Sequence, residues 1–454
     1  MSRTLQAGAA RIEITPPLTI PYLGYEPRHA FFRGVHDPLY ARALAVDDGT
    51  TQAIVIAADA IGFSNDLLGP GRHFTQEVRQ RVEQRSGVPG QHVMLAASHA
   101  HSTPETLNLR RLLDTPAAAP WLEVLLDQLA SAAVIAMERR RPSVVKVGRG
   151  EVRGLAVNRR VYGTDGRLYQ FTQPPSPDLV ADRGAEDPEV GVLLFQAIAG
   201  DASIVVTNFA CHPVTMQVQP LISADFPGAA MRLVEDTIPG CLSSLFLQGA
   251  CGDLNPIRGD TRDFADVWRY GLMLGSEALK LVGQLSAPDY PTGPPVVAVA
   301  SEMVALPGRE LPPREPYRRA FDEAARRLAQ AASAEERARF AHEQRIAEEA
   351  LIQIDRGGGP FPSEVQAIRI GDAALVAIPG EPFVELGLEI KRRSVAPFTF
   401  VVGYANDYQG YLATAKAWQQ GGYEVGHGPW SRVGPEASAL VVDKALALIE
   451  RLWR

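Results

Sequence analysis

Cysteine is scarce in this chain of 454 residues, which contains only Cys211, Cys241 and Cys251. Three thiols are too few, and odd in number, to form the disulfide framework of a small secreted domain, although they still allow a single bridge. The first residues, MSRTLQAGAARIEITPP, lack the apolar core of a secretory signal peptide. These two absences predict a protein of a reducing compartment, and we expect it in the cytoplasm.

Long apolar runs and concentrated positive charge are also missing. No stretch of about 18 apolar residues occurs, so we expect no integral membrane segment. The net charge is -7 and no dense lysine and arginine stripe is present, which excludes a typical nucleic-acid partner. With 46% hydrophobic and 21% charged residues, the composition is that of a globular protein.

Several common catalytic motifs are absent as well. The sequence has no G-x-S-x-G nucleophile elbow, no P-loop and no H-E-x-x-H pair. Its glycine-rich turns lack the spacing and the downstream acid of a dinucleotide site. A zinc site in this chain would therefore use ligands that are far apart in the sequence.

Short apolar runs that are typical of buried strands alternate with helical segments. Residues 41–46, 53–58 and 92–97 are such runs, and residues 66–86 have the charge and apolar spacing of a surface helix. The order strand, helix, strand predicts an α/β fold with a mixed β-sheet core flanked by helices. Further strands are expected at 190–197, 203–207, 243–248 and 373–378.

Residues 313–355 differ from the rest of the chain. From Tyr317 to Arg356 they are rich in Ala, Glu, Arg and Gln and contain neither Gly nor Pro, and Gly357–Gly359 follow. This composition predicts one long helix or a helical hairpin, inserted as a structural element or a lid. The chain exceeds the usual size of a single core, so two or three lobes or one large elaborated domain are the alternatives.

Histidines follow two of the predicted strands. His99 and His101 come directly after 92–97, and His212 follows 203–207. If the chain stays extended, His99 and His101 point to the same side, which suits a metal ion, or one ligand beside a proton donor. Two surface histidines in a loop are the alternative. Cys211, next to His212, is expected to serve packing.

Glu381 and a group of tyrosines complete the set of candidates. Glu381 follows the predicted strand 373–378 and can complete a His/His/Glu shell for zinc; alternatively, it is a first-turn carboxylate of the next helix. The glycine-rich segment near the carboxyl end carries four tyrosines, which suggest a pocket wall with polar tips. These are Tyr404, Tyr408, Tyr411 and Tyr423.

Taken in order, these segments resemble the neutral/alkaline (non-lysosomal) ceramidases. The resemblance covers nearly the whole chain and implies one catalytic domain over residues 1–454, without the C-terminal immunoglobulin-like domain of that family. The blocks that carry it are AGAARIEITPP…YLGY, GVHDPLYARAL, AADAIGF, ASHAHSTPE, NFACHPVTM, ISADFPGAA, FLQGACGDLNP, VAIPGEP and ANDYQGYLAT.

The resemblance implies a catalytic zinc ion and names its ligands. By motif position, the four ligands are His99, His212, Glu381 and Tyr411. It also implies that His101 lies beside the substrate, that Arg159 contacts the substrate or the developing oxyanion, and that Tyr423 belongs to the site. Asp59 and Asp253 occupy matching acidic positions without an assigned role.

The sequence departs from the family at Asn255, which stands where the family has a serine linked to activity. We therefore expect a zinc-dependent amidohydrolase that uses metal-activated water to cleave a small-molecule acyl substrate. The resemblance implies a role in lipid metabolism, but the substrate can be a compound other than ceramide. An esterase, a lactonase or a carbohydrate-derivative hydrolase on the same zinc site is the alternative. A non-catalytic binding protein is a third reading, against which the presence of all four expected ligands counts.

Overall fold

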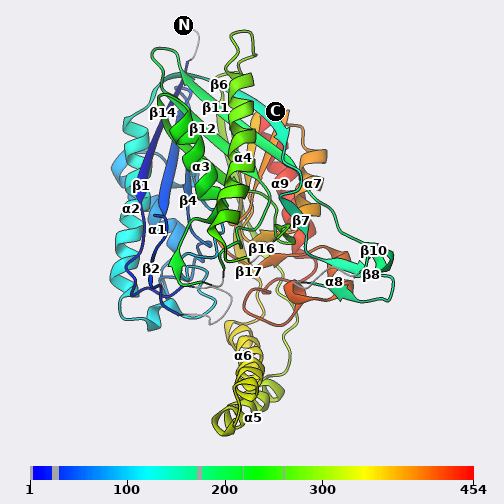
Figure 1. Ribbon diagram of the computed structural model, residues 1–454. Helices are drawn as coiled ribbons and strands as arrows, with labels where there is room; N and C mark the ends of the chain where they lie inside the picture. The colour runs from blue at the N-terminus through cyan, green and yellow to red at the C-terminus, as the bar shows by residue number, and fades with distance from the viewer. Residues whose placement is uncertain (1–3, 23–29, 171–175, 218, 259–260) are drawn as a thin grey trace.

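The computed structural model describes residues 4–22, 30–170, 176–217, 219–258 and 261–454. It is an α/β structure with one eight-stranded sheet, one four-stranded sheet and several two- or three-stranded ribbons among these residues. Helices cover both outer sides of the sheets, as Figure 1 shows. The predicted fold class, a mixed β-sheet core flanked by helices, is confirmed.

The large sheet is mixed, and it curls. Its order is β14-β12-β11-β6-β1-β3-β4-β5, in which the β4–β5 and β12–β14 pairs are parallel and the others antiparallel. The edge strand β14 contacts β1, β3, β4 and β5, so the sheet folds back on itself. The bounds are β1 Leu5–Glu13, β3 Tyr40–Asp47, β4 Gln52–Ala58, β5 Val93–Ala97, β6 Arg141–Glu151, β11 Glu189–Ala197, β12 Ser203–Phe209 and β14 Cys241–Gln248.

The second sheet packs against the inner face of the first. Its order is β16-β17-β18-β20, with β18 and β20 parallel. One apolar cluster joins side chains of both sheets, from Leu44 and Val55 of the large sheet to Leu375 and Phe400 of the small one. The bounds are β16 Val297–Leu306, β17 Phe361–Ile370, β18 Ala373–Ala377 and β20 Phe398–Val402.

Strand β4 shows why the central strands are apolar on both faces. Ile54 and Ile56 point into the cluster formed with the covering helices, whereas Val55, between them, points into the cluster between the two sheets. Because side chains alternate with period two, a strand covered on both faces has no polar positions. The continuous apolar run in the sequence follows from this burial.

Helices form the outer layers. Helices α1 and α2 pack on the half of the large sheet that contains β1 and β3, α3 and α4 pack on the half that contains β11 and β12, and α7 and α9 cover the small sheet. In Figure 1, α1 and α2 lie on one side of the sandwich and α7 and α9 on the other. The bounds are α1 Phe74–Ser86, α2 Ala118–Glu138, α3 Asp225–Thr237, α4 Phe264–Leu285, α7 Val384–Arg393, α8 Ala415–Gln420 and α9 Ala437–Trp453.

Two of these helices test expectations from the sequence. Helix α1 begins only at Phe74, later than the predicted residue 66, because Gly69, Pro70 and Gly71 hold the preceding chain in turns. Within the described residues, α2 alone is long and apolar enough to cross a membrane. More than half of its most apolar stretch is buried, and it packs on β1 and β3, so it serves as a core helix.

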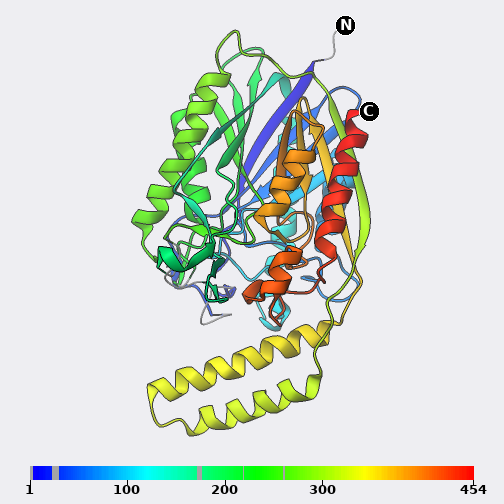
Figure 2. The ribbon, with the colours of Figure 1, turned by 90° about the vertical axis from the view of Figure 1, so that its right-hand side faces the viewer.

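The predicted helical insertion is a hairpin of two helices. Helix α5, Arg314–Gln330, and helix α6, Ala334–Arg356, pack against each other. Figure 2 shows them lying antiparallel beyond one end of the sandwich. The carboxyl end of α6 anchors the hairpin, because Gln353 donates to the Ser431 carbonyl and Arg356 donates to the Asn108 carbonyl.

Candidate metal centre

The candidate residues follow the carboxyl ends of strands in both sheets. His99 follows β5, His212 follows β12 and Glu381 follows β18. Glu381 opens the short strand β19, Glu381–Pro382, which pairs in parallel with β21, Tyr411–Leu412, so that Glu381 and Tyr411 are direct partners. Side chains that are far apart in the sequence thereby reach one place.

Backbone carbonyls orient the two buried histidines. His99 Nδ1 lies 2.6 Å from the Ile61 carbonyl, and His212 Nδ1 lies 2.6 Å from the Cys251 carbonyl. A carbonyl only accepts, so each Nδ1 carries the proton and each Nε2 presents a lone pair. This arrangement, with Nδ1 held by the protein and Nε2 free, is typical of histidines that bind a metal.

Glu381 closes the group. Its Oε2 atom lies 3.4 Å from His99 Nε2 and 3.3 Å from His212 Nε2. All three side chains are buried, with 1%, 0% and 2% of His99, His212 and Glu381 exposed. Burial alone would raise the pKa of Glu381, but His99 and His212 hold it well below its usual range, so the carboxylate is ionised.

His101 reaches the same group of side chains, although the backbone after β5 is not extended. His99 has φ of 66°, in the left-handed region, so the chain turns after β5 instead of staying extended. The turn still brings His101 Nε2 to 3.2 Å from His99 Nε2. The candidate ligand atoms of His99, His101 and His212 lie within 4.8 Å of one another, so His101 is as close to the centre as the expected ligands.

Two tyrosines hold the carboxylate of Glu381. Tyr408 donates its hydroxyl to Glu381 Oε1 at 2.6 Å, and Tyr404 donates to Oε2 at 3.2 Å. The Tyr404 ring also stacks on His99, with ring centroids 3.8 Å apart. Burial raises the pKa of both hydroxyls well above the usual range, so both keep their protons and remain donors.

Tyr411 faces an arginine. Arg159 donates from Nη2 to the Tyr411 hydroxyl at 3.0 Å, from Nη1 to Asn255 Oδ1 at 3.2 Å and from Nε to Glu424 Oε1 at 2.9 Å. Burial alone would lower the pKa of Arg159, but Tyr411 and Glu424 hold it well above its usual range. The guanidinium is therefore a fixed positive charge beside the centre, and Asn255 is one of its supports.

His101 and Tyr423 border the more open side of the site. Both are partly exposed, whereas His99, His212 and Glu381 are buried. Tyr423 stacks on Trp430, with centroids 4.5 Å apart, and meets the Tyr411 ring edge-on. Burial, together with His99 and His212, lowers the pKa of His101 well below its usual range, so its imidazole is neutral at neutral pH.

The donor set fits a divalent cation. Among the described residues, His212 Nε2 has no hydrogen-bond partner, since the carboxylate oxygen nearest to it carries no proton to share. Two imidazole lone pairs and a carboxylate oxygen that face one another would be destabilising without a positive charge between them. Nitrogen and oxygen donors of this kind are what zinc accepts. Tyr411 is the strand partner of Glu381 and is the candidate for a further oxygen ligand.

The sequence profile described as neutral/alkaline non-lysosomal ceramidase, N-terminal, matches residues 5–258 of this chain, which is more than half of its length. The chain belongs to this family. A neutral ceramidase from Pseudomonas aeruginosa is 23% identical over 98% of this chain and 72% of its own length. One from Mycobacterium tuberculosis is 24% identical over 89% and 70%.

The crystal structure of the neutral ceramidase from Pseudomonas aeruginosa has the same fold. It superimposes with a TM-score of 0.73 at 21% identity and covers 99% of this chain and 75% of its own. A structure titled ceramidase complexed with C2 gives a TM-score of 0.71 at 20% identity, over 99% and 76%. At such identity the likeness shows the fold.

Glu424 is a residue of this ceramidase-family site that the sequence did not predict. It is fully buried and accepts from Arg159, Arg160 and Gln170. Tyr404 and Tyr408 were expected only to form a pocket wall, yet both hold Glu381. A buried acid in a glycine-rich loop carries no pattern that separates it from a surface residue, so only the fold could reveal Glu424.

The two acidic residues without an expected role have structural partners. Asp59 accepts from Arg42 at 3.0 Å and from the Tyr40 backbone at 2.9 Å. Asp253 accepts from Asn158 at 2.7 Å and from the Val384 backbone at 2.8 Å, next to Arg159. Leu23, Gly24 and Tyr25 of the opening sequence block lie outside the described residues.

Proposed function

We propose that the chain is a zinc-dependent hydrolase that cleaves an amide (N-acyl) bond. The observation that supports this most is the convergence of His99 Nε2, His212 Nε2 and Glu381 Oε2, each fixed by a second hydrogen bond to the protein. Membership of the ceramidase family supports an amide as the bond that is cut. The proposed ligands are His99, His212, Glu381 and Tyr411.

The chain's own residues would orient the substrate and move its protons. A divalent zinc ion, when bound, supplies a Lewis acid that polarises the carbonyl and activates water. The Arg159 guanidinium, which lies beside Tyr411, would offset the negative charge that develops on the carbonyl oxygen. The neutral imidazole of His101 would accept a proton at Nδ1, the ring nitrogen without a hydrogen-bond partner among the described residues, and return it to the leaving amine, with Tyr423 as a second hydrogen-bond donor.

The names of the relatives support a class of substrate, and Asn255, which stands where the family has a serine, supports the nature of the attacking group. The relatives are named neutral ceramidases, which supports an N-acyl lipid. Asn255 offers no hydroxyl nucleophile, and its Oδ1 accepts from Arg159 instead, so water is the attacking group in this proposal. A smaller or more polar N-acyl compound fits the same chemistry, because the centre acts on the acyl carbonyl alone.

Metal analysis of purified variants tests the proposal. The wild-type protein should contain about one zinc per chain, and His99→Ala and His212→Ala should each lose the metal and the hydrolysis of N-acyl substrates. His92→Ala is the matched control, since His92 bonds to the Gln52 carbonyl away from the site. Unchanged zinc content in both His99→Ala and His212→Ala would show that the ligand assignment is wrong.

A panel of short and long N-acyl amines, esters and lactones tests the bond that is cut. The proposal expects amide hydrolysis by the zinc-loaded wild type and its loss in the two histidine variants. Ester or lactone cleavage without any amide cleavage would contradict the amide assignment and favour the alternative hydrolase on the same centre.

A further inference from the structure

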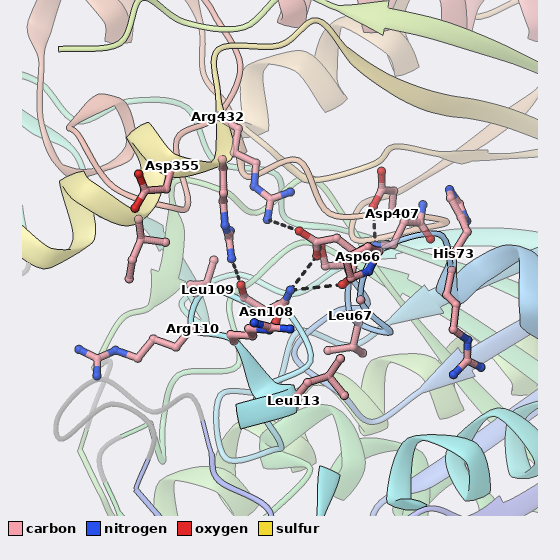
Figure 3. Close-up of a pocket in the computed structure, with 18 of the residues that line it drawn as sticks. Asp66, Leu67, His73, Asn108, Leu109, Arg110, Leu113, Asp355, Asp407 and Arg432 are labelled. Atoms are coloured by element: carbon pink, nitrogen blue, oxygen red, sulfur yellow. Dashed lines mark hydrogen bonds and ion pairs between the residues drawn. The ribbon is translucent and has the colours of Figure 1, made fainter. Parts of the chain in front are cut away.

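A large cavity lies between the sandwich and the base of the helical hairpin. Its volume is about 1180 Å³, and its walls come from residues 64–73, residues 108–114 and the last turns of α6. Figure 3 shows Asp66, Asn108 and Arg432 facing one another in it. His99, His212 and Glu381 do not line it, so it is distinct from the candidate metal centre.

Two arginines of this cavity keep unused hydrogen-bond donors. Arg432 is only 7% exposed, and Nη1 donates to the Tyr408 carbonyl at 3.3 Å. Its Nε and Nη2 have no hydrogen-bond partner among the described residues, since Asp66 Oδ2 lies 3.8 Å from Nη2. Arg356 donates from Nη2 to the Asn108 carbonyl, but Nη1 likewise has no partner in the described part of the chain.

Leaving these donors unused is costly. A buried donor that has lost water and gained no acceptor destabilises the folded protein, and a charged donor does so more strongly. Burial, together with the charge of Arg432, lowers the pKa of Arg356 to about 10, so both guanidiniums are still charged at neutral pH. A ligand that brings acceptor oxygens could supply partners for these three guanidinium nitrogens, Nη1 of Arg356 and Nε and Nη2 of Arg432.

The charges nearby limit how negative such a ligand can be. Asp66 and the buried Glu105 act on Arg356 as opposite charges. Asp407, which also lines the cavity, interacts with Arg432. Acids therefore already offset the two guanidiniums, and a multiply charged anion would add strong repulsion. The other arginines at the wall have partners: Arg110 pairs with Glu348, Arg111 with Asp114, and Arg72 with Glu77 and Glu123. A single carboxylate matches the fork of an arginine and adds one charge.

Part of the wall is apolar. Leu67, Leu113, Ile352 and Phe361 line the cavity together with two prolines. A cavity of this size and lining accommodates a hydrocarbon body as well as a head group. We propose that this cavity binds an amphiphilic monocarboxylate, with its carboxylate at Arg356 and Arg432 and its apolar part along Leu113 and Ile352. An N-acyl hydrolase would release such a compound, but the site is argued from its own geometry.

Calorimetric titration of the zinc-loaded, full-length protein tests the site with octanoate, 1-octanol and inorganic phosphate. Octanoate should bind saturably. 1-Octanol, which lacks the carboxylate, and phosphate, which lacks the apolar tail, should each bind at least about tenfold more weakly. R356Q and R432Q should each weaken octanoate binding about tenfold or more. R72Q is the matched control, because Arg72 lines the same cavity but pairs with Glu77 and Glu123.

Ile352→Trp separates binding from any loss of folding in the arginine variants. It narrows the cavity along the proposed path of the apolar part, leaves both arginines in place, and should weaken octanoate binding about tenfold or more while circular dichroism stays that of the wild type. Three results would overturn the proposal: no saturable octanoate binding, equal binding in R356Q, R432Q and R72Q, or binding that is lost only in His212→Ala. The last result would place the carboxylate on the metal centre.

Discussion

At the scale of single residues, Glu381 shows how the protein prepares an anionic ligand in a buried place. The carboxylate is 2% exposed, accepts hydrogen bonds from two tyrosine hydroxyls and lies beside the two imidazoles. Hydrogen bonds to a ligating carboxylate fix its orientation, and their loss typically lowers metal affinity about 10–100-fold.

Tyr408→Phe should therefore weaken zinc binding by about 10–100-fold while the protein stays folded. Tyr404→Phe should have a smaller effect, because its contact with Glu381 is 3.2 Å compared with 2.6 Å for Tyr408. Competition with a zinc chelator measures both. Tyr290→Phe is the control, since it removes a 2.8 Å hydrogen bond to the Val147 carbonyl far from the site. Equal zinc affinity in all three variants would refute this role.

Asp225 gives a pH-dependent prediction. Burial raises its pKa to about 6 from an ordinary 3.8, so the folded protein binds this proton more tightly than the unfolded chain. Below the unfolded-state pKa of 3.8, the stability that Asp225 contributes is complete. It is lost as the pH rises through the folded-state pKa of about 6. This difference in pKa between the folded and the unfolded protein corresponds to about 3 kcal/mol of unfolding free energy.

The comparison with Asp225→Asn isolates this contribution, because asparagine does not titrate and tolerates the φ of 55° at this position. The unfolding free energy of the wild type minus that of Asp225→Asn should fall by up to about 3 kcal/mol between about pH 4 and pH 7. Urea unfolding at several pH values measures it. Parallel curves for the two proteins would contradict the shifted pKa.

The residues differ in how far the sequence could predict them. His99, His212 and Glu381 follow apolar strands, so a strand-end rule found them, and the structure brings them together. The orientation of His99 could not be predicted, because its positive φ depends on the backbone bond from its N–H to the Ala60 carbonyl and on the turn that follows. Glu424 required the whole loop to be folded.

At the scale of elements, the contact of β1 with α2 depends on Gly8. A Cβ at this position would lie 2.2 Å from the Ala136 carbonyl oxygen and 2.7 Å from the Arg140 nitrogen, which are backbone atoms. Since neither can move alone, a side chain here would force the helix away from the sheet.

Gly8→Ala should lower the unfolding free energy by about 1–3 kcal/mol. Gly283→Ala in α4 is the matched control: no atom lies within 4 Å of its Cβ position, so alanine should leave stability unchanged or raise it by up to about 1 kcal/mol. Chemical denaturation compares the two. A Gly8→Ala protein as stable as the wild type would mean that the helix packs less closely than described.

Strands with a continuous apolar run were predictable. The runs at 53–58 and 92–97 became β4 and β5, which pair in parallel as the strand-helix-strand order indicated. The division of the strands into two facing sheets could not be predicted, because both faces of β4 are apolar whichever layer covers them. The short strands β19 and β21 have two residues each and carry no period at all.

At the scale of the whole molecule, the curled large sheet and the small sheet together direct several strand ends to one place. Loops after β5, β12 and β18 supply His99, His212 and Glu381. Each loop alone offers one ligand of weak affinity, and only the assembled sandwich forms a binding site. We therefore expect metal binding to be coupled to the global fold.

We propose that these three side chains, together with Tyr411, hold one zinc ion. Anomalous diffraction from a crystal of the zinc-loaded protein, recorded on both sides of the zinc absorption edge, tests it most directly. We expect one strong anomalous-difference peak per chain. It should lie within coordination distance, about 2.0–2.2 Å, of His99 Nε2, His212 Nε2 and a Glu381 oxygen. An active crystal with no peak there, or with its zinc bound elsewhere, would contradict the account.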